Sequence, residues 1–364
     1  MTLNELISHL EGLFPRYLQE DYDNSGLQIG QANVVIQGVL VALDCTEVIV
    51  QEAIDKKCNV IVVHHPILFK EVKRIGWASE IERIIHRCIK HDIAVYAIHT
   101  NLDNHISGVN GKIADILGLI QRRVLVPKKQ TLYKLCVYTP IDHQQAVHDS
   151  LCRVGAGGIG EYRDCAFFTE GVGTFTPSKE ANPTIGKADE PTEVAEVKME
   201  YLIEKHRLAE SLEAMRSKHP YEEVAHDLIL LENTNGALGS GLVGILPEAI
   251  EAEKFLLELK NRFRCGVIKH TKLTGKMIKK VALCGGSGSF LTSEALRQNA
   301  DNFISADFKY HDFFAAEGKI ILADIGHYES EQYTSALLVE IIQEKFPTFA
   351  VRLTENNTNP INIL

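Results

Sequence analysis

Asn59-Val-Ile-Val-Val-His-His-Pro66 is the stretch from which the fold of this chain follows. Its apolar run is typical of a buried strand, and it ends in two adjacent histidines followed by a proline. Adjacent side chains on a strand point to opposite faces. The imidazoles of His64 and His65 can converge on one site only where the strand has ended, and Pro66 marks such a turn. If they do not meet at one atom, each can hold one of two neighbouring metal ions.

The composition is that of an ordinary globular protein. The chain has 364 residues, of which 45% are apolar and 24% are charged, so it is long enough for more than one domain. A net charge of −10 argues against a non-specific nucleic-acid binder. The eight cysteines are scattered, which is typical of reduced thiols in a cytosolic protein. No apolar run approaches the ~18 residues of a membrane span, and we therefore expect a cytoplasmic protein.

Apolar strands alternate with amphipathic helices at both ends of the chain. In the first part the predicted strands are residues 34–43, 59–63 and 93–98, and the predicted helices are residues 2–14, 46–57, 79–91 and 108–117. After residue 241 the predicted strands are residues 267–273, 280–283, 302–306, 319–325 and 349–353, and the helices are residues 248–263, 310–317 and about 329–345. Apolar strands that alternate with helices predict parallel sheets covered on both faces.

The middle of the chain follows a different pattern. The predicted strands are residues 131–139, 162–169, 171–176, 193–203 and 224–231, with helices at 143–154 and 205–218 and a polar loop at 177–191. This order is β-α-β-β-α-β with one extra strand, which indicates an α+β ferredoxin-like module. We therefore expect an α/β fold in which two related halves, residues 1–126 and 240–364, form one body with a dinuclear metal site. Residues 127–239 form the inserted domain.

Three of the apolar strands end in residues that bind metals. The polar sequences after them are His64-His65, His99-Thr-Asn-Leu-Asp103 and His327-Tyr-Glu-Ser-Glu331. Ligands of open α/β sheets bind beyond the carboxyl ends of the strands, and parallel neighbours bring these ends to the same edge. One such strand end would be weak evidence, but three of them predict a convergent metal site.

The residue types at these strand ends favour a transition metal. His327 and Glu331 are four residues apart, so they face the same way if a helix begins near residue 328. Imidazoles with carboxylates suit Zn²⁺, or else Fe²⁺ or Mn²⁺, rather than Ca²⁺. Two-metal sites with ions ~3.5–4 Å apart activate water for hydrolysis. We predict two divalent ions, with Asp103 and Glu331 as bridges and with these ligands: His64, His65, Asp103, His327 and Glu331.

Neighbouring residues have less specific interpretations. For His99 we favour a structural role, or support of a metal ligand, over metal binding. The candidate proton-transfer groups are Glu329, His99 and His311. Asp307 is either a supporting group or a helix cap. The sequence Gly285-Gly-Ser-Gly-Ser289 is either a tight turn or an anion-binding loop, although it lacks the established nucleotide-binding patterns. An anion-binding loop would favour a phosphoesterase.

The ordered motifs resemble the family named after the yeast Ngg-interacting factor three, whose bacterial members are described as type 2 homologues of GTP cyclohydrolase I. The matching sequences are Asp23-Asn-Ser-Gly-Leu-Gln28, His64-His-Pro-Ile-Leu-Phe69, His99-Thr-Asn-Leu-Asp103, Ser305-Ala-Asp-Phe-Lys-Tyr-His311 and Gly326-His-Tyr-Glu-Ser-Glu331. The resemblance implies a dinuclear metal site at the same five ligands that the strand ends predict.

The resemblance also implies a ring-shaped homohexamer whose metal sites face an internal cavity. The middle segment is similar to the domain inserted in longer family members, which has the ferredoxin-like fold of nitrogen-regulator and copper-tolerance proteins. The implied reaction is the opening of the guanine imidazole ring of GTP, a small-molecule nucleotide substrate, with release of formate. A different class of function, a metal-binding scaffold or regulatory protein that acts through partners, stays open.

Overall fold

The computed structural model describes residues 1–364 and divides the chain into two compact units. One unit contains residues 1–127 and 236–364, and the other contains residues 128–235. Both units are mixtures of helices and strands, so the α/β character expected from the alternating pattern is present. None of the helices is both long and apolar enough to cross a membrane.

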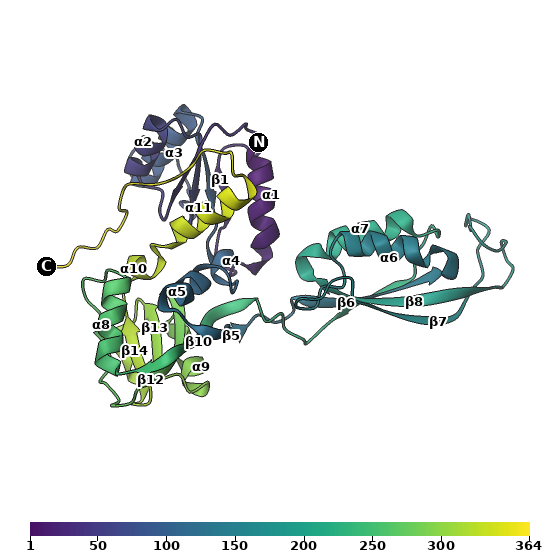
Figure 1. Ribbon diagram of the computed structural model, residues 1–364. Helices are drawn as coiled ribbons and strands as arrows, with labels where there is room; N and C mark the ends of the chain where they lie inside the picture. The colour runs from purple at the N-terminus through teal and green to yellow at the C-terminus, as the bar shows by residue number, and fades with distance from the viewer. The chain divides into compact units, whose positions relative to one another are not determined.

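The first sheet contains the strand that precedes the two histidines, and its edge strand β1 is labelled in Figure 1. Its order is β1-β4-β3-β2-β15, with bounds β1 Gly26–Ile29, β2 Val39–Ala42, β3 Val60–Val63, β4 Ala94–Ala97 and β15 Val351–Leu353. All neighbours are parallel except β1 and β4. Every residue of β2, β3 and β4 is buried, which explains why these strands are apolar throughout.

Helices cover both faces of the first sheet. Their bounds are α1 Leu3–Leu13, α2 Glu47–Asp55, α3 Glu80–Lys90 and α11 Thr334–Lys345. On one face, buried residues of α1 and α11 pack against every second residue of the strands, such as Val60 and Val62 of β3. The core on the other face joins α2 and α3 to the intervening residues, such as Ile61 and Val63. Strand β15 therefore belongs to this sheet and helix α11 packs on it, although both were expected in the second half of the body, residues 240–364.

The second sheet has six strands in the order β11-β14-β13-β12-β10-β5. The bounds are β5 Ile120–Pro127, β10 Gly239–Ile250, β11 Lys269–His270, β12 Ile278–Ser287, β13 Asn302–Ala306 and β14 Ile321–Asp324. Only β12, β13 and β14 are parallel to one another, because the outer strands pair antiparallel. The helices around this sheet are α5 Val109–Leu117, α8 Ala252–Arg262 and α9 Thr292–Arg297. One hydrophobic core contains buried residues from both sheets, such as Val62 and Leu283.

Two short helices follow strands of the two sheets. Helix α4, Thr100–Asp103, comes after β4 of the first sheet, and helix α10, His327–Glu331, comes after β14 of the second. Residues 329–345 were predicted as one helix, which is wrong, because α10 ends at Glu331 and α11 begins at Thr334. Strands β1, β5 and β10 were not predicted, since turn residues or charged side chains interrupt their apolar pattern.

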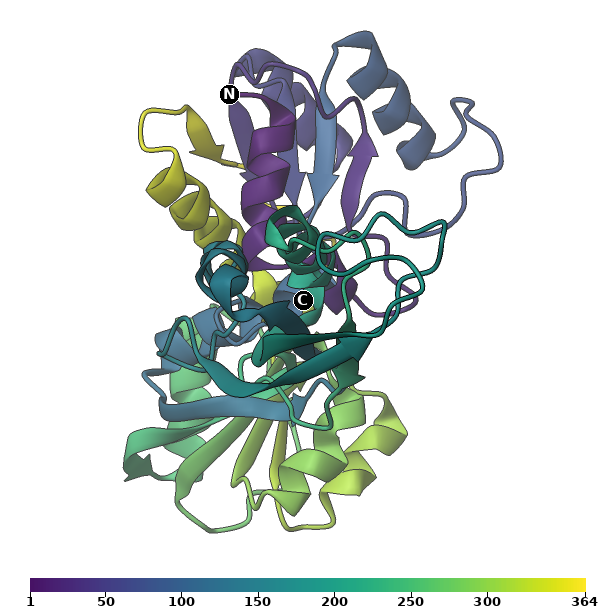
Figure 2. The same ribbon diagram turned by 90° about the vertical axis from the view of Figure 1, so that its right-hand side faces the viewer.

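The other unit is a four-stranded antiparallel sheet with helices on one face, which Figure 2 shows from a second side. In chain order its elements are β6 Leu132–Pro140, α6 Gln144–Arg153, β7 Ala166–Phe175, β8 Thr192–Glu204, α7 Leu208–Lys218 and β9 His226–Leu230. The sheet order is β7-β8-β6-β9. The extra strand predicted at residues 171–176 is wrong, because β7 pairs with β8 without interruption from Ala166 to Phe175.

Candidate metal centre

The three predicted strand ends meet within the larger unit. His64 and His65 directly follow β3, Asp103 ends α4, and His327 and Glu331 begin and end α10. We expected neighbouring parallel strands to bring these residues to one sheet edge. Instead, β3 and β4 belong to the first sheet and β14 to the second, so the cluster draws on two different sheets.

The carboxylate of Glu331 lies at the centre of the cluster and is only 3% exposed. Its Oε2 lies 3.0 Å from Nε2 of His65 and 3.1 Å from Nε2 of His327. Its Oε1 lies 3.9 Å from Nε2 of His64, which in turn lies 3.6 Å from Oδ1 of Asp103. The two oxygens of one carboxylate therefore face different histidines, and these groups include every residue that the sequence predicted as a ligand.

Each imidazole of the cluster is anchored through its other ring nitrogen. Nδ1 of His64 donates to the carbonyl of Ile98 at 2.8 Å. The Nδ1 atoms of three further histidines donate to aspartates at 2.6–2.7 Å, in the pairs His65–Asp44, His99–Asp23 and His327–Asp307. This pattern fixes the ring orientation and is typical of metal-binding histidines, because it leaves Nε2 as the metal-facing atom. Asp307 is thus a supporting group rather than a helix cap.

Three buried polar atoms of the cluster have no hydrogen-bond partner, namely Nε2 of His64, Oδ1 of Asp103 and Oε2 of Glu331. The nitrogens of His65 and His327 are close to that Glu331 oxygen, but their angles are not those of hydrogen bonds. Buried polar groups are almost always satisfied, so three converging exceptions require an explanation. A bound cation would satisfy all three. The residues therefore fit a metal ion.

The charges of the metal-free cluster shift the pKa values of its members. Burial alone would lower the pKa of His65, but Asp44 and Glu331 outweigh it and raise this pKa to about 10. Burial is likewise outweighed at His327, where Glu331 and Asp307 raise the pKa to about 9. Burial and the charge of Glu331 hold the pKa of Asp103 well above its usual range. Without metal, the cluster therefore holds protons that a cation would displace.

The stability of the metal-free protein should accordingly depend on pH. His65 and His327 have folded-state pKa values of about 10 and about 9, above the ordinary value of about 6.5. The stability that these two protonated histidines give the metal-free protein is fully present below about pH 6.5 and is lost as the pH rises through 9 to 10. We expect the difference in Tm between metal-loaded and chelator-treated protein to grow from pH 6.5 to pH 9.5 in thermal melts. A constant or shrinking difference would contradict this protonation scheme.

The three candidate proton-transfer residues lie in different places. The ring of His99 lies 5.2 Å from that of His64 and 5.4 Å from that of His65, and a nitrogen from each ring can meet at one metal ion. Glu329 instead accepts a hydrogen bond from Asn359 at 3.2 Å and lines a neighbouring pocket. His311 is exposed on the 3-10 helix η5, Tyr310–Ala316, where its ring contacts those of Tyr310 and Phe314.

The glycine-rich loop contacts the cluster rather than offering an empty anion site. Its amide groups already donate within the chain, from Gly285 to Asn110, from Gly286 to Ser330 and from Gly288 to Ser305, each at 2.9 Å. A Cβ atom at Gly286 would come 2.3 Å from Oε1 of Glu331. The loop therefore makes room for the central carboxylate and holds α10 through Ser330.

The chain matches a known protein family over nearly its whole length. Residues 1–360 match the family model described as Duf34/NIF3 (NGG1p interacting factor 3). The chain belongs to the Duf34/NIF3 family. The resemblance inferred from the sequence motifs is thereby confirmed.

Relatives of this Duf34/NIF3 protein match over nearly their whole length. A protein of Bacillus subtilis (strain 168) named "GTP cyclohydrolase 1 type 2 homolog" is 36% identical over 99% of this chain and 98% of its own. A protein of the same name from Halalkalibacterium halodurans is 40% identical over 84% of this chain and 82% of its own. The solved structure of a Bacillus cereus protein related to NIF3 is 33% identical, covers 100% of this chain and 99% of its own, and has a TM-score of 0.88.

Two residues that hold histidines of the candidate metal centre were not predicted as part of it from the sequence. Asp44 lies two residues after β2 and accepts the hydrogen bond from His65. Asp23 accepts hydrogen bonds from His99 and Thr100, but its stretch was only matched to the family motif, with either a turn or a pocket wall as its structural interpretation. The position of Asp44 just beyond a buried parallel strand was the available signal, because it is the same signal that found the histidines.

Proposed function

We propose that this Duf34/NIF3 protein is a metal-dependent hydrolase with a dinuclear centre. The observation that carries the proposal is the convergence of unpartnered buried atoms from His64, Asp103 and Glu331 beside His65 and His327. Divalent ions at such a site lower the pKa of water, so that hydrolysis proceeds at neutral pH. Five protein ligands for two ions leave coordination positions open, whereas a purely structural site is closed.

The arrangement of Glu331 supports two ions rather than one. Oε1 faces His64, whose Nε2 also lies near Oδ1 of Asp103, while Oε2 faces His65 and His327. Two different groups of three residues can each hold a metal ion, namely His64, His65 and His99, and His65, His327 and Glu331. We infer that Glu331 would hold both ions, that Asp103 would add a ligand on the side of His64, and that His99 would be an additional ligand or a proton carrier on that side. The imidazoles and carboxylates favour Zn²⁺, with Fe²⁺ or Mn²⁺ as alternatives.

We further propose a nucleotide substrate of the kind that the relatives' name, GTP cyclohydrolase 1 type 2 homolog, suggests. A groove of about 770 Å³ is lined by Tyr22, Asp23 and Phe69, and Asp23 accepts the hydrogen bond from His99. The rings of Tyr22 and Phe69 lie 6.3 Å apart, and Phe69 lies 6.3 Å from the ring of His99. Exposed aromatic rings next to the candidate metal ligands suit a planar base, because every base has an aromatic face that can stack.

The side chains around the cluster can also handle protons. His99 has its Nδ1 fixed by Asp23, so a single ring nitrogen faces the cluster. This arrangement suits proton exchange with a substrate near His64 and His65. Glu329 is less suitable, because it lines a separate pocket, and His311 would need a substrate that extends to η5.

Turnover by the metal-loaded protein tests the proposal. Protein loaded with Zn²⁺, Mn²⁺ or Fe²⁺ should release formate from GTP, and His65→Ala should lose at least about 100-fold in kcat/KM, as expected when an essential catalytic contact is removed. Phe69→Ala should raise KM for GTP about tenfold or more, because stacking contributes roughly 1–3 kcal/mol per base. A panel of phosphoesters distinguishes the alternative phosphoesterase. If the protein binds metal but turns over no substrate, hydrolase activity is excluded for these compounds.

A metal-binding scaffold is the second candidate, and the smaller unit favours it. Its β-α-β-β-α-β order and sheet order support a ferredoxin-like inserted domain, a module that often binds effectors or assembles. Large apolar side chains are exposed on its outer strands, such as Phe167 and Val172 on β7 and Ile229 on β9. We expect a cytoplasmic homohexamer. Light scattering of the purified protein tests the assembly, and a monomer would contradict it.

A further inference from the structure

The C-terminal segment, residues 354–364, follows β15 of the first sheet. Its first residues contact helix α2. The hydroxyl of Thr354 donates to Glu52, and the amide nitrogen of Glu355 donates to the same carboxylate at 3.0 Å. Nδ2 of Asn356 donates to it as well, at 2.8 Å, and Lys56 pairs with Glu355 at 2.8 Å. The start of the segment is therefore fixed to the first sheet and its helices.

Further along, the segment reaches a residue that supports the candidate metal centre. Oγ1 of Thr358 donates to Oδ2 of Asp44 at 2.6 Å. The other oxygen of Asp44 accepts from Nδ1 of His65 at 2.7 Å. One continuous hydrogen-bonded chain thus runs from Thr358 through Asp44 to His65, whose Nε2 lies 3.0 Å from Glu331.

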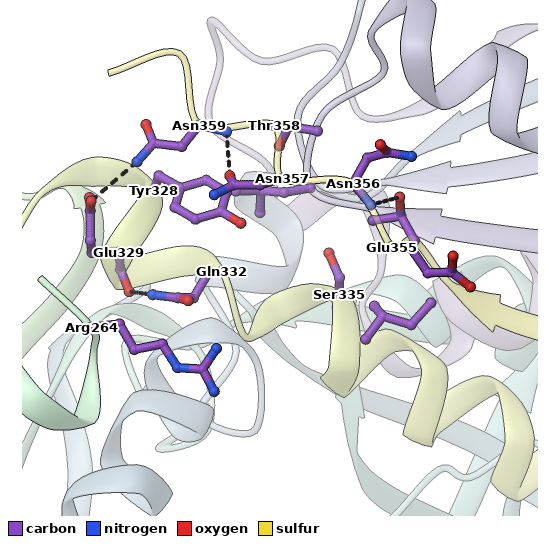
Figure 3. Close-up of a pocket in the computed structure, with 13 residues that line it drawn as sticks. Arg264, Tyr328, Glu329, Gln332, Ser335, Glu355, Asn356, Asn357, Thr358 and Asn359 are labelled. Atoms are coloured by element: carbon purple, nitrogen blue, oxygen red, sulfur yellow. Dashed lines mark hydrogen bonds between the residues drawn. The ribbon is translucent and has the colours of Figure 1, made fainter. Parts of the chain in front are cut away.

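The next residue connects the segment to helix α10. Figure 3 shows Nδ2 of Asn359 directed at Glu329, with Oε1 as the acceptor at 3.2 Å. The same short helix carries His327 and Glu331. Thr358 therefore contacts Asp44, which holds His65, and Asn359 contacts the helix that carries His327 and Glu331.

Polar contacts hold this segment in place, since it has little apolar packing. The side chains of Ile361 and Ile363 are 61% and 54% exposed. The segment forms one wall of a polar pocket of about 430 Å³, whose other walls include Arg264, Tyr328 and Ser335 (Figure 3). Residues 354–359 carry only polar side chains, so the bond from Thr358 to Asp44 is one of the polar contacts that hold this part of the segment in place.

We propose that Thr358 is a positioning residue for the metal centre. Its hydroxyl fixes one Asp44 oxygen, so that the other is held toward Nδ1 of His65 and Nε2 points at the metal. A carboxylate behind a metal-binding histidine orients the ring and makes it a stronger ligand. The inference rests on the proposed metal-binding function and adds that the C-terminal segment tunes the affinity of the site.

The test compares Thr358→Val with Thr358→Ser. Valine keeps the shape of threonine but removes the hydroxyl, whereas serine keeps the hydroxyl. We measure Kd for Zn²⁺ by chelator competition and the visible spectrum of the Co²⁺-loaded protein, with Tm of the metal-free protein as a check on folding. Thr358→Val should weaken Zn²⁺ binding about tenfold, the lower end of the range for groups that support metal ligands. It should also change the Co²⁺ spectrum. Thr358→Ser should have the Zn²⁺ affinity and the Co²⁺ spectrum of the unmodified protein.

The control is Glu355→Gln, which weakens a different contact of the same segment, the exposed pair with Lys56. Its Zn²⁺ affinity and Co²⁺ spectrum should equal those of the unmodified protein. Wild-type affinity and spectrum in Thr358→Val would overturn the inference, and so would an equal loss of affinity in Glu355→Gln. If the unmodified protein binds neither ion, the proposed metal-binding function itself fails, which is a distinguishable result.

Discussion

Replacing Glu331 with glutamine is expected to lower the affinity for divalent metal more than about 100-fold, since loss of a group that only supports a ligand already costs about 10–100-fold. Glutamine keeps the size of the side chain but removes the charge. The Glu331 carboxylate is the one group within 4 Å of three ligand histidines, at 3.0 Å from His65, 3.1 Å from His327 and 3.9 Å from His64. Isothermal titration of chelator-treated protein with Zn²⁺ measures the effect.

Glu340→Gln is the matched control, because it removes the same charge from an exposed carboxylate paired with Lys112. We expect its metal affinity to be unchanged. An affinity in Glu331→Gln within threefold of the control would mean that the buried carboxylate is not a ligand, and the proposed centre would then be wrong.

Gly286→Ala is expected to reduce both stability and metal affinity. Gly286 has a φ of +60°, where any other residue is strained, and the strain costs about 1 kcal/mol of unfolding free energy. The added Cβ would also lie 2.3 Å from Oε1 of Glu331 and 3.4 Å from Cε1 of His327. The carboxylate has to move, so we expect at least about tenfold weaker Zn²⁺ binding, comparable to the loss of a supporting group.

Gly318→Ala separates backbone strain from displacement of the carboxylate. Gly318 has a similar φ of +66°, but a Cβ there would meet nothing within 4 Å. Gly286→Ala should lose at least as much unfolding free energy as Gly318→Ala in urea titrations, while only Gly286→Ala should lose metal affinity. Equal metal affinities in the two variants would contradict the placement of Glu331 against the glycine loop.

The sequence predicted the parts of the site that depend on local pattern. The all-apolar run before His64 identifies β3, and the spacing of four between His327 and Glu331 identifies two residues on one face of α10. Helix α3 was predicted within one residue at each end, because its apolar face repeats at the helical period and Ser79 and Glu82 form its capping box.

Features that depend on contacts between distant segments could not be predicted. No local pattern indicates that β14 joins a different sheet from β3, or that β15 pairs with β2. Asp44 lies 21 residues before its partner His65, and Thr358 lies 314 residues after Asp44. Such pairings are set by tertiary packing: the position of Asp44 after a buried strand marks it as a candidate, but nothing in a single sequence tells which residue it pairs with.

Anomalous diffraction from a crystal of the metal-loaded protein tests the central claim most directly. Data collected just above the absorption edge of the bound metal locate each ion without reference to the protein atoms. We predict two peaks roughly 3.5–4 Å apart, one beside His64 and Asp103 and the other beside His65 and His327, with Glu331 between them. A single peak, or peaks away from these residues, would contradict the dinuclear centre.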